Sequence, residues 1–138
     1  MRVFTVAILL LAAMSATAYS QPPAKVRLGH PVSITNQVLT AGASDTIRFG
    51  RVNKGDVAVR TVTLYNDSDK PFSVVSHQNS CGCTSFRYSR KPVKPGEHTD
   101  IVCSFDSRDA QGWQMKLAKF YLSGTKKPIR IFIDAEVE

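Results

Sequence analysis

The chain of 138 residues lacks the features that mark a disulfide-stapled scaffold or an assembled active site. Its three cysteines allow one disulfide with one thiol left over, which excludes the dense cysteine frameworks of small secreted proteins. No serine, histidine and acid arrangement can be interpreted as a hydrolytic triad, and the aspartates lack the spacing of a calcium loop. We therefore expect packing to supply most of the stability, and we expect no cofactor and no enzyme activity.

Long apolar runs are also missing after the N-terminus, where the first twenty residues are typical of an export signal. Arg2 supplies the positive end, and an apolar run from Val3 to Ala13 is followed by small residues. This run is too short to span a bilayer, and no second apolar run of spanning length follows it. We therefore expect no transmembrane segment in the mature chain. Cleavage is expected after Ala18 or Ser20, with Ser20 favoured, and the mature protein is expected in the periplasm or outside the cell.

Basic residues outnumber acidic ones in the mature chain. Removal of Arg2 with the signal leaves 17 Lys and Arg against 11 Asp and Glu, a net charge of +6. This charge suits an anionic surface, although a solvated face that aids solubility is the simpler interpretation. Nucleic acid is not an expected partner outside the cytoplasm. The sequence predicts a basic patch that comprises Arg87, Arg90, Lys91 and Lys94.

Several segments alternate apolar and polar residues with the period of a strand that is buried on one face. The clearest is 129–137, and the turn at 123–128 predicts that it returns antiparallel to 118–122. Further alternating segments lie around 47–49, 57–66, 72–74 and 101–106. The predicted inward-facing residues are Ile47, Phe49, Val62, Leu64, Ile101, Cys103, Phe105, Ala118, Phe120, Leu122, Ile129, Ile131, Ile133, Ala135 and Val137.

Six or seven short strands without a convincing amphipathic helix predict an all-β fold. We expect an immunoglobulin-like antiparallel β-sandwich of about seven strands. The chain would divide into a signal peptide (1–20), a leader segment (21–44) with one added strand around Val32 to Leu39, and the sandwich domain (45–138). Trp113 is expected as a core plug or loop anchor, and Asn66-Asp67-Ser68 is interpreted as an Asx-type turn although it has glycosylation spacing.

An ordered set of landmarks runs through most of the mature domain. It comprises Phe49-Gly50, Gly55, Asn66, Pro71-Phe72, Val74, Ser80 to Thr84, Pro92-Val93, Pro95-Gly96-Glu97, Ile101 and Phe105-Asp106. This pattern resembles the bacterial family known as domain of unknown function 1573, whose members are exported β-sandwich domains. The resemblance implies structural roles for Phe49, Gly50, Asn66, Gly82, Pro95, Gly96 and Phe105. His77, Phe86 and Cys103 depart from residue types that are usual in the family.

The Cys81-Gly82-Cys83 motif is the strongest candidate for chemistry. On an extended strand both sulfurs would project from one face while Gly82 points away. Extension separates the two Cα atoms by roughly 6.6 Å, near the upper limit of about 6.8 Å for a disulfide. A Cys81–Cys83 bridge would then be strained unless Gly82 permits a tight turn, and strained bridges are easily reduced. The basic residues after the motif would favour a thiolate if they fold toward it.

Metal binding is the second chemical interpretation of these cysteines. Cys81, Cys83 and His77 are close in sequence, and soft sulfur ligands favour copper(I) or zinc. A closed zinc site generally needs four ligands, and no second ligand pair follows the motif, so the sequence predicts no complete metal site. Cys103 lies between two apolar inward positions and is expected in the core, while a bridge from Cys103 to Cys81 or Cys83 stays open as an alternative.

These observations favour a binding role over a catalytic one. We expect a non-enzymatic exported domain that supports protein interaction or envelope organisation and binds an envelope or secreted protein, with an anionic surface as a further partner. Free strand edges supply the means, because their unpaired backbone groups accept another strand. Thiol redox chemistry or soft-metal binding at the Cys-Gly-Cys motif is the alternative function.

Overall fold

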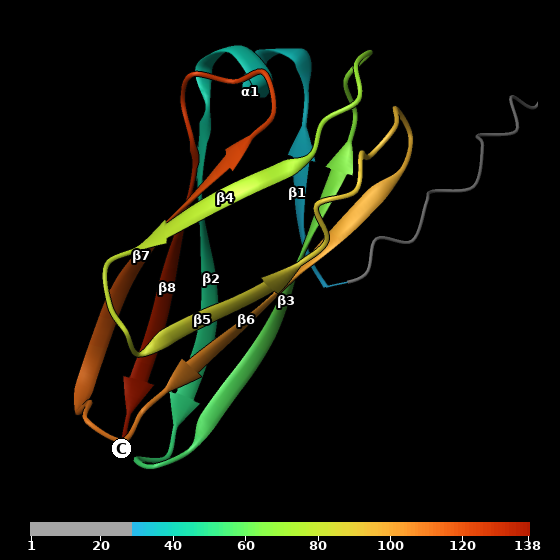
Figure 1. The fold of residues 1–138 in the computed structure, drawn as a ribbon. Helices are drawn as coiled ribbons and strands as arrows, with labels where there is room; N and C mark the ends of the chain where they lie inside the picture. The colour runs from blue at the N-terminus through green and yellow to red at the C-terminus, as the bar shows by residue number, and fades with distance from the viewer. Residues whose placement is uncertain (1–28) are drawn as a thin grey trace, which may run out of the picture.

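The computed structural model describes residues 29–138, which form two four-stranded β-sheets packed face to face (Figure 1). Sheet 1 has the strand order β1-β3-β6-β5, and sheet 2 has the order β2-β8-β7-β4. The all-β sandwich predicted from the sequence is confirmed, with eight strands in the described residues. The elements are β1 (His30–Ile34), α1 (Asn36–Ala41), β2 (Ala43–Val52), β3 (Val57–Asn66), β4 (Val74–Asn79), β5 (Thr84–Tyr88), β6 (His98–Asp106), β7 (Gly112–Leu122) and β8 (Ile129–Val137).

Two strand pairs run parallel, whereas the sequence predicts antiparallel sheets. β1 pairs with β3 so that His30 lies opposite Val62, and β2 pairs with β8 so that Ala43 lies opposite Ile129. The ladders of β3 with β6, β5 with β6, β4 with β7 and β7 with β8 are antiparallel. Alternation of side chains reports which face of a strand is buried but not which strand lies beside it. Both sheets are therefore mixed.

The added strand predicted around Val32 to Leu39 overlaps β1 only at residues 32–34, because β1 ends at Ile34 and residues 36–39 lie in α1. Val32 and Ile34 are buried in the core. The chain then forms the short helix α1 because Thr35 caps it, with the Val38 N–H donating to Thr35 Oγ1 at 3.3 Å. This helix carries the chain from sheet 1 to sheet 2.

The export prediction concerns a part of the chain that the structure does not describe. The predicted signal peptide, residues 1–20, and the start of the predicted leader, residues 21–28, lie outside the described residues. Within residues 29–138, no helix is long and apolar enough to cross a membrane. Export of the chain therefore stays a prediction.

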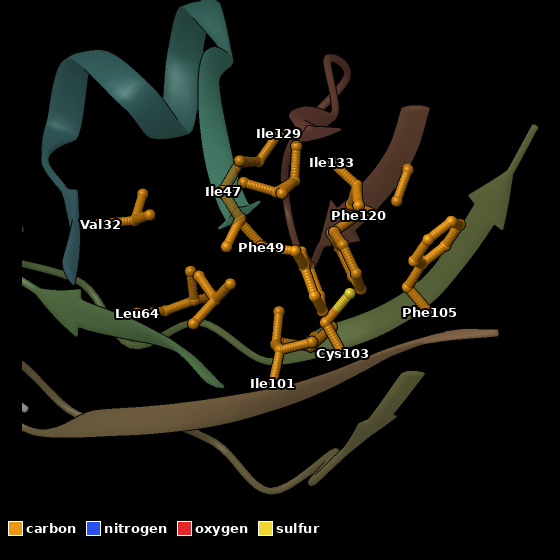
Figure 2. Packing of buried hydrophobic residues seen from close by; sticks show 14 of the residues in the cluster. Val32, Ile47, Phe49, Leu64, Ile101, Cys103, Phe105, Phe120, Ile129 and Ile133 are labelled. Carbon is orange, nitrogen blue, oxygen red and sulfur yellow. The ribbon is translucent and has the colours of Figure 1, made fainter. Parts of the chain in front are cut away.

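The core lies between the sheets and consists of the residues predicted from alternation. Phe49 and Phe105 pack edge to face with ring centroids 6.2 Å apart. Figure 2 shows the sulfur of Cys103 pointing into the same cluster, and burial raises the pKa of this thiol to about 12. Cys103 is therefore a protonated core residue at neutral pH. The other predicted inward residues are all buried: Ile47, Val62, Leu64, Ile101, Ala118, Phe120, Leu122, Ile129, Ile131, Ile133, Ala135 and Val137.

Trp113 is not a core residue, so the prediction of a core plug or loop anchor is wrong. Its side chain is 63% exposed on β7, and its indole Nε1 donates a hydrogen bond to Asp134 Oδ1 at 2.8 Å. The even-numbered residues of β7 from Ala118 onward face the core, so the odd-numbered ones point outward. The alternation along β7 therefore determines that Trp113 faces outward. The size and apolar character of its side chain do not.

Two of the glycine landmarks have backbone conformations that other residues rarely adopt. Gly50 has a φ of 74° at a β-bulge where the register of β2 against β8 shifts after Arg48. The bulge follows Phe49, which stays in the core. Gly96 has a φ of 84° and follows Pro95 in a turn before β6. Gly50 thus lets β2 continue past the bulge, and Gly96 lets the chain turn into β6.

Asn66 joins several loops at one end of the sandwich, and the predicted Asx-type turn is confirmed. The Ser68 N–H donates to Asn66 Oδ1 at 3.0 Å, and the Asn66 amide donates to the carbonyls of Lys70 and Val93, both at 2.8 Å. The Asn66 carbonyl accepts the Gly96 N–H at 2.8 Å. Asn66 is 1% exposed, so its buried side chain holds these loops together through hydrogen bonds.

Candidate functional site at the Cys-Gly-Cys turn

Cys81, Gly82 and Cys83 form a turn that leads from β4 in sheet 2 to β5 in sheet 1, at the left of Figure 1. The two sulfurs are joined in a disulfide, and the Cα atoms of the two cysteines are 5.1 Å apart. The Thr84 N–H donates to the Cys81 carbonyl at 3.3 Å and closes the turn. Of the two geometries considered from the sequence, an extended strand and a tight turn, the structure has the turn, because the chain changes sheets at this point.

Hydrogen bonds fasten the turn to both sheets. On the side of sheet 2, the Ser80 N–H donates to the Leu117 carbonyl, and the Leu117 N–H donates to Ser80 Oγ, both at 2.9 Å. On the side of sheet 1, the Asp106 N–H donates to the Cys83 carbonyl at 2.8 Å. The Asn79 amide donates to the Cys81 carbonyl at 2.7 Å. The backbone around the disulfide is thus held by several bonds that do not involve sulfur.

Gly82 is exposed and has open space around it. Among the described residues, no atom outside its chain neighbours lies within 4 Å of the position that a Cβ would take there. Gly82 also does not have a positive φ. No close packing of another described segment therefore requires glycine at this position. The absence of a side chain leaves the flank of the disulfide uncovered.

A cleft of about 290 Å³ lies beside the disulfide. One wall is the turn itself, and the other walls come from the loop between β6 and β7 and from the start of β7. The residues that line it are Cys81, Gly82, Cys83, Asp106, Arg108, Asp109, Ala110, Gln114 and Lys116. The volume is near the lower end for ligand pockets, so the cleft has room for the tip of a peptide loop.

The charged residues of the cleft differ in how they are paired. Arg108 Nη2 lies 2.7 Å from Asp106 Oδ2. Hydrogen bonds from the side chain and the backbone of Arg108 lower the pKa of Asp106 from its usual value. Lys116 has no ion-pair partner in the part of the chain that the structure describes. Lys116 is therefore the cation of this cleft that can stabilise a new negative charge.

The structure does not bring His77 into a metal site with Cys81 and Cys83. His77 Nδ1 lies 2.9 Å from the Tyr88 hydroxyl oxygen, and the His77 ring stacks on Phe120 with centroids 5.8 Å apart. Within residues 29–138, no three His, Cys, Asp or Glu side chains gather closely enough to hold a metal ion. His77 belongs to an aromatic cluster beside the core.

The predicted basic patch lies outside the cleft beside the disulfide. Its members are all exposed, and none of them lines the cleft: Arg87, Arg90, Lys91 and Lys94. The cleft is lined instead by residues that lie more than twenty positions from the motif in sequence, namely Arg108, Gln114 and Lys116. The pairing of β4 with β7 brings Gln114 and Lys116 there, and the pairing of β5 with β6 brings Arg108 there. Alternation in the sequence does not report either pairing.

The sandwich with its Cys-Gly-Cys turn matches a known family. A family model described as a protein of unknown function (DUF1573) matches residues 40–137. The chain belongs to the DUF1573 family. The resemblance found in the sequence is confirmed, and membership in DUF1573 does not by itself assign a role to the chain. None of the curated proteins matches the chain.

Solved structures similar to this DUF1573 chain share its fold. A protein of unknown function from Porphyromonas gingivalis is 17% identical with a TM-score of 0.58, and the match covers 67% of this chain and 44% of that protein. The VesB protease of Vibrio cholerae is 13% identical with a TM-score of 0.54, over 67% and 30% of the two chains. The secreted serine protease VesC of the same organism is 11% identical with a TM-score of 0.53, over 65% and 21%. The DUF1573 chain spans less than half of each, and these likenesses show the fold alone.

Proposed function

We propose that the mature chain is an exported, non-enzymatic interaction domain that binds a protein of the cell envelope or a secreted protein. The observation that carries the proposal is an exposed apolar surface beside unpaired basic groups on the outer face of sheet 2. A surface of this kind is typical of protein interfaces, whose centres are rich in aromatic residues and methionine.

The apolar part, here called the outer patch, consists of Trp113, Met115, Leu117 and Phe132. Residues 113, 115 and 117 point from the same face of β7 because successive side chains of a strand alternate. Phe132 lies opposite Leu117 on β8. Trp113 is 63% exposed and Met115 is 40% exposed. The hydrogen bond to Asp134 holds the indole in place, so little side-chain entropy is lost when a partner covers it.

The basic part adjoins the outer patch. Lys119 lies directly opposite Arg130 on the neighbouring strand, and like charges in this position destabilise a sheet. Both residues line a hollow of about 370 Å³ together with Lys127. None of the three has an ion-pair partner within residues 29–138. A carboxylate that entered the hollow would offset this repulsion.

The occupant that fits this face is a protein segment with apolar side chains followed by an acidic one. The apolar residues would cover Trp113 and Met115, and the acidic residue would enter the hollow beside Lys119 and Arg130. β4 pairs with β7 and is the edge strand of sheet 2, so an extended segment could also pair with its outer edge. Binding of this kind needs no catalytic group.

Site-specific photo-crosslinking in producing cells tests the proposed face. A photoreactive phenylalanine analogue at Met115 is expected to give one discrete adduct with another protein. The same analogue at Val59, which is 49% exposed on the outer face of sheet 1, should give none. Charge reversal by Lys119→Glu with Arg130→Glu should remove the Met115 adduct, because the carboxylate of the partner would then be repelled. The adduct mass and its tryptic peptides identify the partner.

Several outcomes of that experiment would contradict the proposal. A Met115 adduct with the mass of two copies of this chain would mean self-association instead of a separate partner. Equal adducts at Met115 and Val59, or no adduct at either position, would mean that the outer patch is not an interface. An adduct that survives the charge reversal would exclude an acidic partner segment.

Export is tested by the N-terminus of the protein recovered from producing cells. Intact-mass measurement is expected to show a mature chain that begins at Gln21, because the signal is removed during export. Leu10→Arg places a charge in the apolar run and should leave an uncleaved chain that begins at Met1. A parent chain that also retains Met1 would contradict export, whereas a chain that begins at Tyr19 would support export with cleavage after Ala18.

A further inference from the structure

The Cys81–Cys83 disulfide is not needed to hold its own turn. It closes a loop with one intervening residue, and a loop this short constrains the unfolded chain far less than a long one. The bonds from Ser80 to β7 and from Asp106 to the Cys83 carbonyl fasten the turn independently of the sulfurs. Reduction would therefore leave two thiols side by side in a folded domain.

The disulfide can also be approached by another chain. Gly82 offers no side chain, and its backbone and surroundings accept a larger residue, so nothing in the described fold requires glycine there. The cleft reaches the turn from the side of β7. A thiol on a peptide loop can thus reach the sulfurs without any rearrangement of the strands.

The two sulfurs differ in their surroundings. Cys83 packs against the hydrophobic core. Cys81 Sγ accepts the Cys83 N–H at 3.1 Å, and the unpaired Lys116 lines the same cleft. An N–H donor and a cation both stabilise a thiolate. Cys81 is therefore suited to carry a partner sulfur or a negative charge, while Cys83 is suited to the inner position.

We propose that Cys81–Cys83 is a redox-active disulfide that exchanges with a pair of thiols on a protein partner. The partner thiolate attacks Cys81 Sγ, the bond to Cys83 breaks, and Cys83 leaves with the electron pair and takes a proton from water. The second partner thiolate then attacks the partner sulfur in this mixed disulfide and releases Cys81. The partner is oxidised to a disulfide and the domain is reduced by the same two electrons.

The reverse sequence restores the domain. Cys81 as a thiolate attacks a donor disulfide, carried by a protein or a small molecule, and expels one donor sulfur. Cys83 then attacks Cys81 and expels the other donor sulfur. In both directions the mixed disulfide is on Cys81. Cys103 takes no part, because it is fully buried in the core and its thiol stays protonated.

This proposal goes beyond the interaction role and uses the opposite side of the same strand. Trp113 and Met115 point outward from β7, whereas Gln114 and Lys116 line the cleft. Exchange with a small thiol needs no protein bound to the outer patch. A test with glutathione can therefore succeed or fail independently of the crosslinking experiment.

Glutathione exchange followed by thiol alkylation and mass spectrometry tests the assignment on the folded chain. The parent protein is expected to pass from disulfide to dithiol as the ratio of reduced to oxidised glutathione rises, with unchanged circular dichroism. Cys83→Ser with oxidised glutathione should accumulate an adduct at Cys81, because no resolving thiol remains. Cys81→Ser should accumulate at least about tenfold less adduct at Cys83, because that sulfur packs against the core.

A matched pair of lysine variants tests the role of the cleft cation. In Cys83→Ser, the added change Lys116→Gln should slow alkylation of Cys81 at neutral pH by about threefold, because a nearby cation favours the thiolate. Lys70→Gln removes the same charge from an exposed residue that does not line the cleft, and it should leave the rate unchanged. Equal rates in the two variants would remove Lys116 from the assignment.

Three results would overturn the redox proposal. A disulfide that resists reduction until the chain is denatured would be a structural bond. A dithiol form that loses its circular dichroism signal would show that the disulfide holds the fold. Equal trapping by Cys81→Ser and Cys83→Ser, or trapping by neither, would contradict the division of roles between the two sulfurs.

Discussion

Phe105→Asp should leave the chain without a cooperative thermal transition at neutral pH. Phe105 is fully buried and packs edge to face on Phe49. Loss of a buried aromatic ring costs about 3–5 kcal/mol, and an unpaired charge in the apolar interior costs several more. The sum rivals the roughly 5–15 kcal/mol that stabilises a folded domain of this kind. Far-UV circular dichroism during heating measures the loss.

A charge placed on the other face of the same sheet is the control for this substitution. Val59→Asp introduces the same carboxylate at a residue that is 49% exposed and lies opposite Ser104, so it should cost about 1 kcal/mol or less. Burial raises the pKa of the carboxyl introduced by Phe105→Asp, so part of the lost stability should return as the pH falls toward about 5. A melting temperature for Phe105→Asp equal to that of the parent would contradict the face assignment of β6.

The faces of the strands could be predicted because burial on one side leaves a period of two in the sequence. In β8, Ile131 and Ile133 face the core while Arg130 points to solvent, and the prediction of this pattern needs no knowledge of neighbouring strands. The same reasoning placed Cys103 in the core between Ile101 and Phe105. These features depend on local alternation alone.

Strand partners could not be predicted in the same way. The parallel pairing of β1 with β3 and of β2 with β8 depends on how the N-terminal segment crosses between the sheets through α1. At Gly50 the bulge interrupts the alternation of β2, so even the length of that strand is hard to read from the sequence. Pairing is a non-local property, whereas periodicity is a local one.

The candidate site shows the same division between local and non-local features. The cysteine pair is evident from the sequence, and the resemblance singles it out. Its cation is Lys116 instead of a residue of the nearby basic stretch, because the pairing of β4 with β7 brings β7 beside the turn. The exposed Trp113 is likewise a consequence of register. Residues that act together here come from distant strands.

Asn66→Asp should strongly destabilise the domain, although it only replaces the NH2 group of the side chain by an oxygen. The amide of Asn66 donates to the carbonyls of Lys70 and Val93 from a side chain that is 1% exposed. A carboxylate has no donor for these two oxygens, so both hydrogen bonds are lost at about 1 kcal/mol each, while the Lys70 carbonyl keeps the Ser68 hydroxyl and the Val93 carbonyl keeps the Phe72 N–H as donors. The added negative charge lies against both carbonyls. We expect the melting temperature to fall by at least about 10 °C.

The control separates this buried amide from an exposed one. Asn36→Asp keeps the side-chain oxygen that accepts the Asp69 N–H at 3.1 Å and lies on the surface, so it should shift the melting temperature by only a few degrees. Burial raises the pKa of the carboxyl introduced by Asn66→Asp, and the protonated form regains one donor. Its deficit relative to the parent should therefore shrink as the pH falls. Equal melting temperatures for the two variants would mean that the amide of Asn66 does not tie the loops together.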